Sequence, residues 1–155
     1  MKKWKVYVLN ILIPLAVGGL SAYITMQGME DFNSVSKSAL NPPDYVFPIV
    51  WSILYVLMGF GMAKVYLSHC PTDQKSYSVI IYGLQLAFNF CWSIIFFNMK
   101  SYLFALIWLI ILIALVIIMI YSWQKCSKLA AYLQVPYLLW LLFASYLTFC
   151  VYSLN

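Results

Sequence analysis

The sequence contains little charge: only 8% of its 155 residues are Asp, Glu, Lys or Arg. Soluble domains usually carry about a quarter charged residues. Hydrophobic residues make up 65% of the chain and aromatic residues 19%, and the mean hydropathy is +0.91. This composition excludes an ordinary soluble domain, and it equally excludes an intrinsically disordered chain.

Arginine is absent, and the net charge of +5 comes from nine lysines set against four acidic residues. No block of lysines is long enough to follow a phosphate backbone, so we expect no nucleic-acid partner. The single histidine, His69, lies beside Cys70 without further metal-ligating neighbours in sequence, so no metal site is predicted. There is also no glycine-rich phosphate loop, catalytic triad or carboxylate pair.

Cysteine is scarce too, and its four positions are widely spaced: Cys70, Cys91, Cys126 and Cys150. This spacing fits no zinc motif. Cys91 and Cys150 fall inside apolar runs, where buried thiols are common. We therefore expect free cysteines rather than a disulfide framework.

Long apolar runs dominate what is present, and a membrane-spanning helix needs roughly 20 apolar residues. Five runs meet this length, at approximately residues 4–26, 44–67, 77–97, 102–123 and 129–152. They are continuous rather than alternating, which disfavours a transmembrane β-barrel. The sequence predicts an all-α membrane protein, with one five-helix bundle as the single domain over residues 1–155.

The only long polar stretch, residues 27–43, follows the first run and ends in Asn41-Pro42-Pro43, which stops one helix and starts the next. A loop of this length is more often functional than a simple connection. Short later links make successive helices antiparallel, so the lysines divide seven to two between the ends. The N-terminal end carries Lys2, Lys3, Lys5, Lys64, Lys75, Lys125 and Lys128, and the other end carries Lys37 and Lys100. This bias predicts a cytoplasmic N-terminus, with the C-terminus and the polar loop outside.

Ionisable groups are nearly absent from the apolar runs, so no proton relay or gating-charge array is expected. Polar but neutral and aromatic residues recur instead on single helix faces. These faces are Gln85, Asn89, Trp92 and Phe96; Trp51, Tyr55, Met58 and Met62; and Tyr137, Trp140, Ala144 and Thr148. An amide in hydrocarbon needs a partner, so Gln85 and Asn89 should face the interior. Two interpretations stay open: the amides join helices, or they anchor a flat apolar ligand in a pocket with aromatic walls.

Three segments resemble the translocator protein family, also known as TspO or peripheral benzodiazepine receptor proteins. They are Asn41-Pro42-Pro43 followed by residues 50–59 (VWSILYVLMG), residues 85–97 (QLAFNFCWSIIFF) and residues 135–147 (VPYLLWLLFASYL). The resemblance implies a five-helix bundle, often a homodimer, with a pocket closed by the first loop. In that family the pocket binds porphyrins, including heme, and isoquinoline or benzodiazepine ligands; no cofactor is required.

The matching motifs place four residues in that pocket: Trp51, Asn89, Trp140 and Ala144. The polar loop adds Pro42, and Phe104 lies where relatives can have a tryptophan. The inward stripes add Tyr55, Gln85 and Trp92 to the candidate ligand-binding residues. Apart from Gly18-Gly19, Gly59 and Gly61, no small-residue face for a dimer interface is evident.

The resemblance implies porphyrin sensing, sequestration or transfer. Light- and oxygen-dependent porphyrin breakdown on Trp51 and Trp140 is an alternative, and transport or regulation of small hydrophobic molecules is another. The chain departs from the family pattern Trp-Tyr…Lys-Pro-x-Trp in the first loop, where it has Asp31-Phe32 and Lys37-Ser38-Ala39-Leu40. Whether this loop still closes over a ligand stays open. The C-terminal residues 147–155 contain no cation, so specific cholesterol recognition is not predicted.

Overall fold

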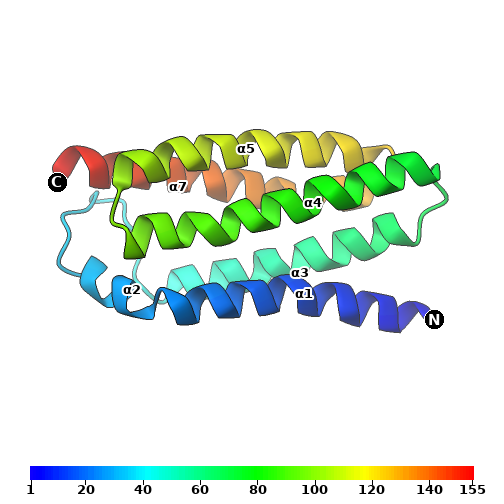
Figure 1. The fold of residues 1–155 in the computed structure, drawn as a ribbon, viewed down its shortest axis with the longest axis horizontal. Helices are drawn as coiled ribbons and strands as arrows, with labels where there is room; N and C mark the ends of the chain where they lie inside the picture. Colours follow the sequence, from blue (N-terminus) through cyan, green and yellow to red (C-terminus); the bar gives the residue numbers. More distant parts are fainter.

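The computed structural model describes all 155 residues as a bundle of helices whose long axes run roughly parallel (Figure 1). Five of its helical segments are long and apolar enough to cross a membrane. They are α1 (Lys3–Ile24), α3 (Val46–Tyr66), α4 (Thr72–Ser93) with the π-helical turn η1 (Ile94–Asn98), α5 (Tyr102–Gln124), and α6 (Lys128–Tyr132) with α7 (Val135–Leu154). The predicted five-helix membrane bundle is confirmed.

The ends of two of these helices are set by proline and by a charged residue, which a hydropathy profile does not detect. Helix α4 begins at Thr72, before the apolar run, because Pro71 precedes it and Asp73 in its first turn suits the positive end of the helix dipole. The last span is broken between Tyr132 and Val135, which places Pro136 in the first turn of α7, where a missing backbone N–H does no harm.

Two groups of helices form the bundle: α1 packs along α3, and α5 packs against both α4 and α7 (Figure 1). Glycines permit the closest approaches. A Cβ atom on Gly59 would collide with the backbone of Asn10 and Ile11, and one on Gly18 would enter the ring of Tyr55. These glycines serve packing within the chain. Two glycines face outward with open space around them, Gly19 on α1 and Gly83 on α4.

A disulfide joins Cys70 to Cys126, with their Cα atoms 5.0 Å apart. The expectation of four free cysteines is therefore wrong for this pair, whereas Cys91 and Cys150 are free. The two residues are 56 positions apart, and only the antiparallel course of α4 and α5 brings their connections to the same end. We call this end, which also carries the N-terminus, the disulfide end.

The opposite end, here the lid end, is covered by the polar stretch. This stretch starts with a short helix, α2 (Met26–Phe32), and continues without regular structure over residues 33–45. The side chain of Asn155 accepts a hydrogen bond from the Ser36 amide (3.3 Å) and donates one to the Ser36 carbonyl (2.9 Å). The Ser38 hydroxyl lies 3.3 Å from that of Tyr146. The lid is thus attached to the C-terminal part of α7.

Candidate functional site

The interior is crossed by a chain of hydrogen bonds that connects α3, α4 and α7. The Tyr55 hydroxyl donates to the Asn89 side-chain oxygen (3.4 Å), and the Asn89 amide donates to the Tyr137 hydroxyl (2.8 Å). Tyr137 in turn donates to the Gln85 side-chain oxygen (2.8 Å). All four side chains are buried, so the prediction that Gln85 and Asn89 face the interior is confirmed.

This network has a consequence for the two interpretations of the amide stripe. Both polar atoms of Asn89 are engaged within the chain, and the Gln85 nitrogen lies 4.0 Å from the sulfur of Met58. In this arrangement the amides join helices, as buried polar groups in hydrocarbon must. A ligand reaches Asn89 only by displacing one of these bonds, and the Tyr55 bond is the longest and therefore the weakest.

The two tryptophans named by the motifs have different neighbours. Trp51 is half-buried, stacks on Tyr55 with ring centroids 5.6 Å apart, and meets the edge of Tyr137 at 6.2 Å. Trp140 packs between Phe47 (5.8 Å) and Phe143 (5.7 Å). Trp51 therefore borders the hydrogen-bonded network, whereas Trp140 borders the outer side of the bundle.

Trp140 forms one wall of an open apolar groove of about 400 Å³ between α3 and α7. The groove is lined by Val50, Ile53, Leu54, Pro136, Leu139, Trp140 and Phe143. Its volume lies within the range of small-molecule sites, and such sites are mostly apolar with aromatic walls. Because it opens on the side of the bundle, a ligand dissolved in the bilayer can enter it directly.

The other predicted site residues lie apart from this groove. Trp92 is buried on α4 and stacks on Phe96 (5.1 Å), with no partner for its indole N–H. Phe104 is exposed on the outer face of α5, where it packs on Trp108 (5.9 Å).

Ala144 and Pro42 are half-buried, on α7 and in the lid. The sequence motifs do not identify Phe47 and Phe143 as site residues; only their spacing of four residues from Trp51 and three from Trp140 points to them.

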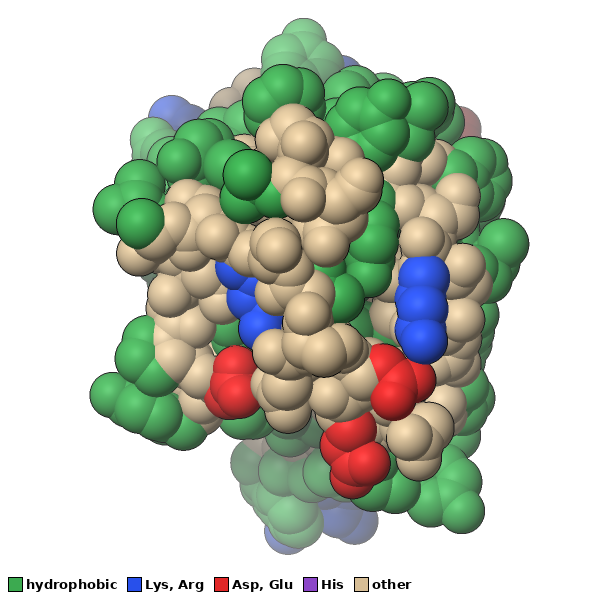
Figure 2. Space-filling view, turned by 90° about the vertical axis from the view of Figure 1, so that its left-hand side faces the viewer, with side chains coloured by type: hydrophobic (Ala, Val, Ile, Leu, Met, Phe, Trp, Pro, Cys, Tyr) green, Lys and Arg blue, Asp and Glu red, His purple; other side chains and the backbone are tan.

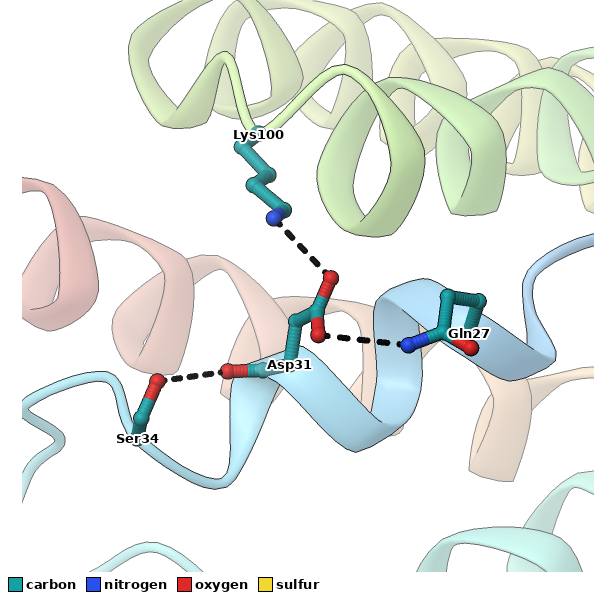
Figure 3. A network of polar contacts seen from close by, with 4 residues as sticks. All are labelled: Gln27, Asp31, Ser34 and Lys100. Atoms are coloured by element: carbon teal, nitrogen blue, oxygen red, sulfur yellow. Dashed lines mark hydrogen bonds and ion pairs between the residues drawn. The ribbon is translucent and has the colours of Figure 1, made fainter.

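The lid end holds a single ion pair, Lys100 Nζ to Asp31 Oδ2 at 3.1 Å (Figure 3). The hydrogen bond and the charge of Lys100 lower the pKa of the Asp31 carboxyl, and Gln27 adds a weaker hydrogen bond (3.5 Å). Both partners are about half exposed, so solvent screens the pair.

The disulfide end is held by buried hydrogen bonds instead. The hydroxyls of Ser78 and Ser122 lie 2.7 Å apart, Gln74 donates to the Ser122 hydroxyl (2.9 Å), and the Trp123 indole donates to the Ser78 carbonyl (3.3 Å). The polar face of α4 thus continues from Gln74 to Asn89 through the interior.

Comparison with known proteins agrees with this architecture. The profile of the TspO/MBR family matches residues 10–153. The chain is 37% identical over 124 residues to "Tryptophan-rich protein TspO" of Chlorobaculum tepidum, covering 80% of this chain and 78% of that protein. It is 35% identical over 150 residues to the protein of the same name from Archaeoglobus fulgidus, covering 96% and 95%. Identity to the human "Translocator protein" is 32% over 136 residues, covering 87% and 80%. With the family profile matched over residues 10–153, and with five helices apolar and long enough to cross a membrane, the chain belongs to the TspO/MBR family of integral membrane proteins.

Proposed function

We propose that this protein binds a porphyrin or a similarly flat, largely apolar molecule in the groove between α3 and α7, and that it senses, sequesters or transfers it. The observation that supports this most directly is the apolar groove of about 400 Å³ with an indole, Trp140, as one wall. A flat aromatic ligand gains dispersion and stacking energy against such a wall. Isoquinoline and benzodiazepine compounds have the same character and would compete for the groove.

Trp51 contributes to the same proposal from the inner side of α3. Phe47, one turn before Trp51 on α3, touches Trp140, and we expect a ligand that displaces the Phe47 ring to reach both indoles. The hydrogen bond between Tyr55 and Asn89 is the longest of the network and should break first. The Asn89 oxygen is then free to accept a hydrogen bond from a polar edge of the ligand. Trp140 would provide the stacking surface, Trp51 a second wall and Asn89 the polar contact.

Quenching of tryptophan fluorescence by protoporphyrin IX in detergent micelles tests the proposal. We expect Trp140→Phe to weaken binding about two- to tenfold, the factor that corresponds to one aromatic stacking contact. Trp51→Phe should weaken binding less. Trp4→Phe is the matched control, because Trp4 lies exposed near the N-terminus, remote from the groove. Unchanged affinity in the Trp51→Phe/Trp140→Phe double variant would contradict the proposal.

A light- and oxygen-dependent breakdown of the bound porphyrin is the second candidate. The stacked pair Trp51–Tyr55 favours it, because an indole oxidised by the excited macrocycle could in turn oxidise the adjacent phenol. One defined open-chain product, formed only with light and oxygen and lost in Trp51→Phe, would support this activity. A mixture of bleached products that forms equally in Trp51→Phe would show ordinary photosensitised damage.

We further propose a homodimer formed through the outward face of α4. Gly83 and Ala87 are both exposed and lie four residues apart, the small-xxx-small spacing that lets two membrane helices approach closely. Gly83→Leu should shift the protein to monomer in light scattering of the detergent-solubilised protein. Gly19→Leu is the control, because Gly19 also has open space around it but lies on α1. A dimer that survives Gly83→Leu and Ala87→Leu would exclude this interface.

A further inference from the structure

A second cavity, of about 310 Å³, lies at the lid end beneath α2 and apart from the α3–α7 groove. It is lined by Gly28, Asp31, Phe32, Ser34, Val35, Phe96, Phe97, Lys100 and Tyr102. Figure 2 shows this end of the molecule, with basic and acidic side chains on the surface around a hollow that has hydrophobic atoms at its base. The cavity therefore combines an aromatic base with a charged rim.

The aromatic base is built by the π-helical turn that ends the third span. Phe96 and Phe97, both in η1, approach Phe32 of α2 with ring centroids 5.2 and 5.6 Å away. Gly28 brings α2 close to η1, because a Cβ there would collide with or crowd the Phe97 carbonyl and the Asn98 side chain. Single π-helical turns are often found at functional sites, where they redirect side chains.

The charged rim depends on Lys100, the one non-glycine residue with a left-handed backbone (φ 53°). This conformation is uncommon for a residue with a side chain, and here it directs the ammonium toward α2, 3.1 Å from the Asp31 carboxylate. A second ammonium, of Lys37, lies 4.5 Å from the ring centre of Phe32. Lys100 lines the cavity and Lys37 lies over the Phe32 ring, so an acid that enters the cavity meets a cation at its rim.

We propose that this lid cavity binds a carboxylate carried by a planar aromatic group, and that Lys100 exchanges Asp31 for that carboxylate. The Asp31 side chain already shows that a carboxylate fits against the Lys100 ammonium, and a charge-assisted bond of this kind can pass from one carboxylate to another. Phe32, Phe96 and Phe97 also line the cavity and would contact an edge of the flat part of the ligand. Asp31 acts as an internal competitor for Lys100.

Two sources can supply this chemistry. A propionate of a porphyrin seated on the tryptophans could extend into the cavity, and this version rests on the function proposed above. A small free aromatic acid could instead occupy the cavity alone, which does not depend on that function. The test therefore compares protoporphyrin IX with its dimethyl ester, and indole-3-acetate with indole-3-acetamide.

The two rim variants have opposite expected effects, which a purely structural ion pair would not produce. Lys100→Gln should weaken binding of the acids about two- to fivefold, the range of a solvent-exposed ion pair. Asp31→Asn should strengthen it by a similar factor, because Lys100 loses its competitor. The ester and the amide should respond to neither variant. Lys128→Gln removes one positive charge at the disulfide end and controls for net charge.

Equilibrium binding and thermal unfolding, measured on every variant, distinguish a ligand site at the lid cavity from an ion pair that only stabilises the lid. An effect confined to protoporphyrin IX, or confined to indole-3-acetate, supports the inference and identifies the source. Equal weakening by Lys100→Gln and Asp31→Asn would overturn it, because the pair would then only hold the lid in place. Acid and ester that bind equally to every variant, with no binding of indole-3-acetate, would also overturn it. Failure of both porphyrins to bind would contradict the proposed function alone. Binding of indole-3-acetate would still test whether the lid cavity takes a carboxylate.

Discussion

The two ends of the bundle are held together by different means. At the disulfide end, a covalent bond and the buried hydrogen bonds of Ser78 and Ser122 fix the helix connections. At the lid end, the contacts of Asn155 and the Asp31–Lys100 pair are exposed to solvent and individually weak. The comparison therefore indicates a rigid base and an adjustable cover.

Loss of the disulfide should have the largest effect on this asymmetry. The chain-entropy relation for a closed loop of 56 residues gives at most about 4 kcal/mol, and less where the unfolded state keeps its helices in the membrane. Cys70→Ser/Cys126→Ser should therefore lower the melting temperature in detergent, and a reductant should do the same to the unaltered protein. Cys91→Ser is the control, since Cys91 is free. Equal melting temperatures with and without reductant would remove the distinction between the two ends.

The same cysteines also test the orientation that we propose from the lysines. Seven lysines at the disulfide end predict that this end is cytoplasmic, whereas disulfides persist mainly in oxidising compartments. With a cytoplasmic base, we expect Cys70 and Cys126 to be alkylated as thiols in intact cells only by a membrane-permeant reagent, and to pair after isolation in air. If an impermeant reagent labels these cysteines after mild reduction of intact cells, the disulfide end faces outward and the proposed orientation is wrong.

Tyr137→Phe should cause the next largest loss of thermal stability. Tyr137 lies in the middle of the bundle, between the two ends. The missing hydroxyl leaves the Gln85 oxygen and the Asn89 amide without partners, which costs about 1–3 kcal/mol for a buried polar group. Tyr55→Phe removes only the 3.4 Å bond and should cost less. Thermal unfolding of both variants measures the difference, and an equal or reversed order would show that the interior network is not organised around Tyr137.

A smaller effect is expected from Asn155→Ala at the lid end. The substitution removes both hydrogen bonds to Ser36, at roughly 0.5–1.5 kcal/mol each before solvent exposure reduces the figure. The melting temperature of the bundle should hardly change, whereas proteolytic cleavage within residues 33–45 should accelerate. Ser153→Ala, which alters a neighbouring exposed side chain without a lid contact, is the control. A large fall in melting temperature would mean that the lid is part of the rigid core.

The smallest effect should be the pH dependence of the lid. Lys100 lowers the pKa of Asp31, so the pair stabilises the lid fully above the ordinary carboxyl pKa near 4 and is lost as the pH falls through the lowered value. Hydrogen exchange of α2, corrected for the intrinsic effect of pH, should be constant between pH 5 and 8 and should accelerate only below about pH 4. Asp31→Asn should abolish the change. Acceleration between pH 5 and 7 would implicate another group.

The sequence predicted the spans because membrane insertion depends on local hydropathy and length, and it predicted that Gln85 and Asn89 face inward because an amide in hydrocarbon requires a partner. It could not identify the partner of each amide, since Tyr137 and Tyr55 come from other helices. It also missed the pairing of Cys70 with Cys126, because residues 56 positions apart meet only once α4 and α5 have packed. The candidate site was predictable as a set of aromatic residues, but not as a groove on the outer side of α3 and α7.

Apolar runs, turn prolines and family motifs thus determined the number of helices, their order and the family, all of which depend on interactions within one segment or on patterns along the chain. Tertiary structure decided which indole faces the groove, which glycines lie in contacts between helices and which cysteines form the disulfide. It also set Lys100 against Asp31 across two connections 69 residues apart. These properties depend on the side chains that neighbouring helices present to one another, and no single segment contains that information.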